Sequence, residues 1–184
     1  ELHIISRAGK KEEIHEDDLH LYGVPGNRLM ALMAMKTAAH ALIQANDIEV
    51  VSAQDPFEYG YVALKAVEGT NAKLHVQVHT DFLSPWFVRS GNIRSAQVHM
   101  PVLNRLRLRL ADQVLPSASG IRAVSKRVAD SLVAHYGARI PVPTVIPIAV
   151  SSEVPPAASI PGNHFSFALV AFGRLEPEKR IEDI

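Results

Sequence analysis

The sequence predicts an α/β fold in which a parallel sheet carries helices on both faces. Three observations predict it. Short apolar runs rich in β-branched residues recur along the chain, stretches with helical composition separate them, and Gly, Pro or a capping residue stands at most junctions. Connections between parallel strands are right-handed and lay their helices against the sheet. With 184 residues, the chain has room for one such domain, or for one domain and part of another.

The expected elements alternate along the chain. The strands are expected at residues 2–6, 19–24, 48–52, 74–79, 121–124 and 144–148, and the helices at 28–44, 55–67, 103–114 and 125–136. Asn27 is a good N-cap for the first helix, and Pro56 suits the first turn of the second. Residues 9–18 are charged and polar, so we interpret them as a connection between two strands. Residues 82–97 are ambiguous.

A change of composition divides the chain near residue 150. Residues 1–150 form the expected domain, and residues 151–163 contain Pro155, Pro156 and Pro161 and are expected to be a linker. Residues 164–184 hold one more strand, at 165–172, and the start of a helix near Glu178, which we interpret as the opening of a second domain. The strand at 165–172 is apolar enough that we expect it to dock on the sheet or to pair with another copy.

Composition and charge exclude several classes of protein. Lys and Arg total 19 and Asp and Glu total 19, which argues against a nucleic-acid binder with a basic surface. The absence of Cys excludes disulfide scaffolds, thiolate zinc sites and thiol catalysis.

The sequence also indicates where the protein resides. It contains no apolar run long enough to span a membrane, and its first residues do not form a signal peptide, so we expect a cytoplasmic location. The chain lacks an initiator Met and opens almost inside a strand, so we expect that its start has been removed. Arg105, Arg107 and Arg109 lie on an apolar helix, which is typical of a solvated face; the alternative is peripheral contact with the inner face of a membrane.

Polar residues follow the expected strands at their carboxyl ends, where open parallel sheets bind ligands. The residues so placed are Arg7, Gln54, Asp55, His79, Thr80, Asp81 and Ser125. His79 is the strongest candidate, because a neutral imidazole can exchange hydrogen bonds with a sugar hydroxyl and the nearby Asp81 carboxylate can orient it. The alternative is a histidine that caps its strand.

The other candidates have ordinary structural alternatives. Asp55 can accept from an acceptor hydroxyl or can stabilise the first turn of the next helix. Ser125 is first of all a helix N-cap, although free amides at that helix start can receive an anion. His75 is expected to be structural. His75 and His79 lie four residues apart on a strand, which does not pair ligands, so we expect no metal site.

A second informative stretch follows the strand at 165–172. Gly173 ends that strand, Arg174 follows at once, and Lys179 lies in the first turn of the next helix. Two cations beside a helix N-terminus suit a diphosphate. The alternative is an ordinary turn with solvated charges.

Four segments, in this order and spacing, resemble the family-four retaining glycosyltransferases. They are residues 51–57 (VSAQDPF), 76–82 (VQVHTDF), 121–125 (IRAVS) and 172–179 (FGRLEPEK). The resemblance implies a GT-B fold, in which two Rossmann-like domains face each other across a cleft. Residues 2–7 resemble the second strand of that family, so the chain is expected to be the N-terminal, acceptor-side domain without its first strand.

The resemblance also implies roles for the candidate residues. His79 matches the family's catalytic strand-end histidine near the transferred sugar. Gly173, Arg174 and Lys179 match the residues that contact the donor diphosphate, whereas Asp55, Asp81 and Ser125 remain acceptor-side candidates. The donor is a nucleotide diphosphate sugar, and neither a metal nor another cofactor is needed.

The expected function is therefore sugar transfer from that donor to a glycan, lipid or small-molecule acceptor, with no activity in the truncated chain alone. Two alternatives stay open. One is a non-enzymatic α/β domain that binds a ligand or a protein at the same edge. The other is a different GT-B enzyme, such as a sugar-nucleotide epimerase.

Overall fold

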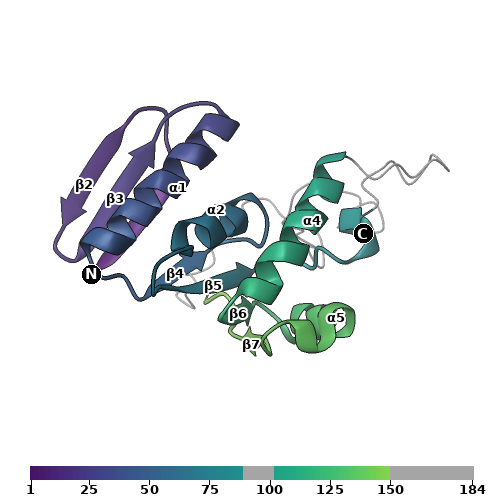
Figure 1. Ribbon diagram of the computed structural model, residues 1–184. Helices are drawn as coiled ribbons and strands as arrows, with labels where there is room; N and C mark the ends of the chain where they lie inside the picture. Colours follow the sequence, from purple (N-terminus) through teal and green to yellow (C-terminus); the bar gives the residue numbers. More distant parts are fainter. Residues whose placement is uncertain (89–101, 150–184) are drawn as a thin grey trace, which may run out of the picture.

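The computed structural model describes residues 1–88 and 102–149, in which three consecutive strands come first and helices separate the strands that follow (Figure 1). The strands are β1 (Leu2–Arg7), β2 (Glu12–Glu16), β3 (Leu19–Val24), β4 (Val50–Ala53), β5 (Lys73–Val78), β6 (Gly120–Ala123) and β7 (Thr144–Val145). The helices are α1 (Arg28–Ala45), α2 (Glu58–Val67), α3 (Pro85–Val88), α4 (Val102–Ser117) and α5 (Lys126–Tyr136), followed by a 3₁₀ turn at Gly137–Arg139. The expected linker at 151–163 and the segment 164–184 lie outside the described residues.

Strands β4 to β7 form a parallel sheet in the order β4-β5-β6-β7, which confirms the α/β fold. One face of this sheet is fully buried at its two central strands: Val76 and Val78 of β5 pair with Ile121 and Ala123 of β6, and none of the four is more than 2% exposed. These residues share one core with buried residues of α2, α4 and α5. The strands lie in the sheet in the same order as in the chain. Right-handed crossovers between them therefore place α2, α4 and α5 on this one face.

The other face of the same sheet is polar and carries no helix among the described residues, so the expectation of helices on both faces is not met there. Its side chains bond to one another. The Ser52 hydroxyl lies 2.9 Å from His75 Nδ1 and accepts from Gln77 Nε2 at 3.1 Å, and Arg122 donates to Gln77 Oε1 at 2.6 Å. The alternation of apolar and polar residues along β5 therefore separates a core face from an open face.

The first three strands form a separate sheet in the order β1-β3-β2. Strand β1 runs parallel to β3, and β2 runs antiparallel to it. Our interpretation of residues 9–18 as a mere connection was wrong, because β2 lies inside it. Every residue of β2 is exposed, so the strand has no apolar alternation to reveal it and is held at the sheet edge by backbone pairing. The hairpin turn uses Asp17 at a φ of 48°, a conformation that Asp tolerates.

Helix α1 links the two sheets. The Asn27 side chain accepts from Met30 N at 3.0 Å, which confirms the predicted cap. The helix lies along the first sheet and beside α2 (Figure 1), and a small apolar cluster joins these elements. The cluster consists of Ile5, Val24, Ala31, Met35 and Val62. None of the described helices is long and apolar enough to cross a membrane.

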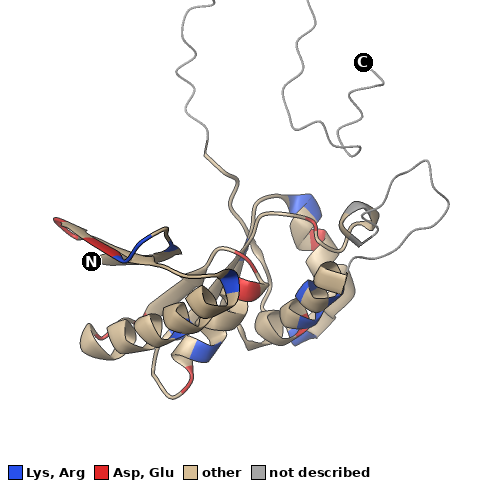
Figure 2. Ribbon diagram, turned by 90° about the horizontal axis from the view of Figure 1, so that it is seen from above, with Lys and Arg blue, Asp and Glu red and all other residues tan. Residues whose placement is uncertain are grey.

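Charged residues are distributed unevenly over the ribbon (Figure 2). Acidic residues gather on the β2–β3 hairpin, which contains Glu12, Glu13, Glu16, Asp17 and Asp18. Basic residues mark α4, where Arg105 and Arg109 are exposed as expected. Arg107 differs, because its guanidinium pairs with Glu58 of α2 and lies 5.7 Å from the centre of the Phe57 ring.

Candidate functional site at the carboxyl edge of the sheet

The candidate residues gather where β4, β5 and β6 end. These strands are parallel and in register, so the residues that follow them meet at one edge. Gln54 and Asp55 follow β4, His79 and Thr80 follow β5, and Ser125 lies two residues after β6. The structure therefore brings together the candidates that sequence analysis placed on this edge, with the exception of Arg7, which ends β1 in the other sheet.

His79 is exposed at the end of β5. The chain around it is firmly held: Val124 N donates to Val78 O at 3.2 Å, and Phe82 N donates to Thr80 O at 2.9 Å. The Phe82 side chain is 1% exposed and packs edge-on against Phe57. His79 thus presents an accessible imidazole on a fixed backbone, as a residue that binds a ligand requires. Its catalytic role stays a prediction.

Asp81 is engaged with α5. Its Oδ1 accepts from the Ser131 hydroxyl at 2.9 Å, and its Oδ2 lies 3.7 Å from Arg127 Nε. The side chain is only 13% exposed. These contacts tie the loop after β5 to α5, so Asp81 braces the position of His79 and leaves little of its own carboxylate free.

Asp55 stabilises the start of α2, the structural alternative considered above. Its Oδ1 accepts from Phe57 N at 2.8 Å. Burial raises the pKa of Asp55, and the nearby negative charge of Glu58 raises it further. Hydrogen bonds from backbone amides, of which that of Phe57 has the largest effect, partly offset this rise. The helix itself begins at Glu58, so Asp55 and Pro56 precede it instead of opening it.

Ser125 is the N-cap of α5. Its hydroxyl accepts from Val128 N at 3.3 Å, and its backbone is extended, as a cap requires. The hydroxyl is therefore occupied by its own helix.

His75 is structural, as expected. Its Nδ1 contacts the Ser52 hydroxyl. Burial lowers the pKa of His75, and the nearby positive charge of Arg122 lowers it further. It lies on the open face of the sheet, away from the edge where His79 stands.

Sequence analysis missed Glu58, which joins three helices. Its carboxylate pairs with Arg28 of α1 and with Arg107 of α4, and its side chain is 12% exposed. The two arginines lie 30 and 49 residues away in sequence. No local pattern marks such a bridge, because only the packing of α1, α2 and α4 brings the three charges together.

The surface of the described residues is hollowed at two places that bear on ligand binding. The smaller, of about 150 Å³, lies beside the bridge and is lined by Arg7, Arg28, Glu58, Tyr59 and apolar residues of α1. The larger, of about 580 Å³, lies at the opposite, amino end of the sheet, near the first residues of β4 and β5. The smaller one lies near the carboxyl end of β1, in the first sheet, so neither hollow coincides with the edge that carries His79.

Comparison with known proteins identifies the family. The family model described as Glycosyltransferase Family 4 matches residues 1–154. This chain belongs to glycosyltransferase family 4. The match confirms the resemblance inferred from residues 51–57, 76–82 and 121–125. A search of the curated proteins finds no match. The remaining residues expected at the family-four site, Gly173, Arg174 and Lys179, lie outside the described residues.

Proposed function

We propose that this chain carries the acceptor side of a sugar-transfer site. The reaction moves a sugar from a nucleotide diphosphate sugar to a hydroxyl of a glycan, lipid or small-molecule acceptor, with retention of configuration. The family match over residues 1–154 carries the proposal. The sheet β4-β5-β6-β7, with its ligand-binding edge, is compatible with the N-terminal half of a GT-B fold.

In this proposal His79 contacts the sugar that is transferred. A neutral imidazole can donate one hydrogen bond and accept another, so it can hold a sugar hydroxyl during the transfer. The bond from the anomeric carbon to the diphosphate oxygen breaks, the bond to the acceptor oxygen forms, and the proton of the acceptor hydroxyl passes to the leaving diphosphate. The accessible position of His79 at the end of β5 supports this role. Asp81 holds the loop that carries His79, through its contacts with Ser131 and Arg127.

The leaving nucleoside diphosphate requires positive charge. Arg174 and Lys179, beside Gly173, are the residues we propose for it, because the helix expected to begin near Glu178 would bring both cations close to its N-terminus. Such charge, fixed in place before the reaction, stabilises the negative charge that develops on the leaving group without a metal.

The test is a transferase assay on the natural protein that contains this chain. Release of nucleoside diphosphate is followed with a panel of uridine, guanosine and adenosine diphosphate sugars. His79→Gln is expected to lower kcat about 100-fold. His135→Gln, an exposed histidine of α5, serves as the matched control and should retain full activity. Full activity of the His79 variant would overturn the proposed role.

A further inference from the structure

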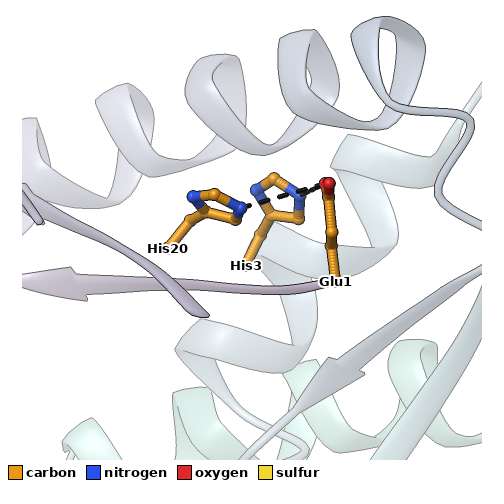
Figure 3. A group of neighbouring side chains, drawn as sticks. All are labelled: Glu1, His3 and His20. Carbon is orange, nitrogen blue, oxygen red and sulfur yellow. Dashed lines mark ion pairs between the residues drawn. The ribbon is translucent and has the colours of Figure 1, made fainter. Parts of the chain in front are cut away.

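Three histidines lie side by side across the first sheet. Backbone pairing sets His3 of β1 and His15 of β2 directly opposite His20 of β3. The rings of His3 and His20 stack with their centres 4.7 Å apart. Glu1, two residues before His3, has its carboxylate on the same side of the sheet, as Figure 3 shows. The group therefore combines one carboxylate with several imidazoles.

The cluster lies on the face of the sheet that α1 covers. Ile5, two residues after His3, and Val24, four residues after His20, pack against Ala31 and Met35 of α1. Because alternate side chains of a strand share a face, His3 and His20 point to the same side. The His3 side chain is 9% exposed and that of His20 is 19% exposed.

The distances between the candidate ligand atoms suit a small cation. Glu1 Oε2 lies 3.5 Å from His3 Nε2 and 3.8 Å from His20 Nε2, and the three atoms all lie within 4.8 Å of one another. A tetrahedral Zn²⁺ site with ligand bonds near 2.0–2.1 Å separates its ligands by about 3.3 Å. A modest movement of these side chains would therefore bring all three to bonding distance of one ion.

The opposite nitrogen of each candidate ring has a partner. His3 Nδ1 lies 3.2 Å from the Tyr22 hydroxyl, and His20 Nδ1 lies 2.7 Å from His15 Nδ1. When each Nδ1 carries the proton and donates it to that partner, each Nε2 is left with a free lone pair. Histidines that bind metals are held in this way by a second hydrogen bond.

His3 Nε2 itself is buried and has no hydrogen-bond partner. Buried polar atoms in folded proteins rarely lack a hydrogen-bond partner, so each such atom requires a physical explanation. A bound cation would satisfy this atom and would also neutralise the charge of Glu1.

We propose that Glu1, His3 and His20 bind a divalent transition-metal ion of the zinc type. Imidazole nitrogen and carboxylate oxygen are ligands that Zn²⁺ accepts, and no thiolate is needed. His15 and Tyr22 orient the ligand rings. The ion links β1 to β3 in a sheet that exposes Leu2, Ile4 and Ile14, so its role is to stabilise the first sheet. The site is independent of the sugar-transfer site at the end of β5.

The test is titration of the metal-free chain with Zn²⁺, monitored by calorimetry. We expect one ion per chain with a Kd in the micromolar range or below. Glu1→Gln and His3→Gln should each weaken binding at least about 10-fold, and His15→Gln should weaken it by about 10-fold through its effect on His20. Glu16→Gln and His135→Gln, at exposed positions, are the matched controls and should leave binding unchanged.

A measurement on the unaltered chain guards against variants that fail to fold. Binding of Zn²⁺ should shift the ring-nitrogen NMR signals of His3 and His20 but not that of His135, and Co²⁺ should give the strong visible absorption of a four-coordinate site. Acetylation of the terminal amine should leave the affinity unchanged. Absence of binding at 1:1, shifts confined to other histidines, or loss of binding on acetylation would overturn the proposal.

Discussion

At the scale of single residues, the carboxyl edge of the sheet separates side chains that hold the fold from exposed ones, among them His79. Asp55 and Ser125 each accept a backbone amide near a helix start, and Asp81 binds two groups of α5. His79 is exposed on the same edge. Position at a strand end therefore predicts where a site lies, whereas the local hydrogen bonds show which residues are already occupied.

The role of Asp55 can be tested with two substitutions. Asp55→Ala removes the acceptor of the Phe57 amide and should lower the free energy of unfolding by about 1 kcal/mol. Asp55→Asn keeps an acceptor oxygen and removes a carboxylate whose pKa is raised by burial, so it should cost much less. Urea denaturation at neutral pH measures both. Equal losses in the two variants would show that the charge, and not the hydrogen bond, is what matters.

His75 makes stability depend on pH. Burial lowers its pKa in the folded chain below the ordinary value of 6.5, so the unfolded chain takes up this proton first as the pH falls. The unfolded state then binds more protons, and the contribution of His75 to stability declines as the pH drops through 6.5 and below. NMR titration of the His75 ring in the native chain and in denaturant measures the two pKa values. A native value equal to or above the denatured one would refute this.

At the scale of elements, helix packing depends on one carboxylate and one glycine. Glu58 joins α1, α2 and α4 through two guanidinium groups. Gly60, in the first turn of α2, allows close contact with α4, because a Cβ there would lie 2.9 Å from Val114 Cγ1 and 2.6 Å from the Asp55 carbonyl oxygen. The start of α2 is thus the point at which the helices of both sheets are held together.

Removing the Glu58 charge should loosen this contact. Glu58→Gln keeps one acceptor oxygen but removes the negative charge that Arg28 and Arg107 share, and because the carboxylate is largely buried, we expect a loss of about 1–3 kcal/mol in the free energy of unfolding. Glu68→Gln, which breaks the exposed pair with Lys65 in the same helix, is the control and should have little effect. The two variants are compared by chemical denaturation. An equally small effect of both would mean that the bridge adds nothing to stability.

Local patterns predicted most of the elements. The bounds of β3 and the caps of α1 and α5 agree with expectation, because apolar runs and capping residues act within a few positions of the sequence. Strand β2 was missed because it is exposed throughout and Ile14 is its one apolar residue. The division into two sheets was also missed, because the pairing of strands that are distant in the chain produces no pattern in the local sequence.

At the scale of the whole molecule, function depends on groups that the fold brings together from distant positions. His79 and its neighbours could be placed from sequence because the ends of parallel strands share an edge. The bridge at Glu58 and the cluster of Glu1, His3 and His20 could not, because helix packing and strand register create them. Family membership over residues 1–154 supports the proposal that the edge carrying His79 serves sugar transfer.

The most direct test of the account follows the ring of His79 by NMR in the natural protein that contains this chain. If His79 contacts the transferred sugar, as proposed, its ring signal shifts saturably with a nucleotide diphosphate sugar and much less with the nucleoside diphosphate alone. A His79 signal that ignores every nucleotide sugar, or that responds equally to the nucleoside diphosphate, would contradict it.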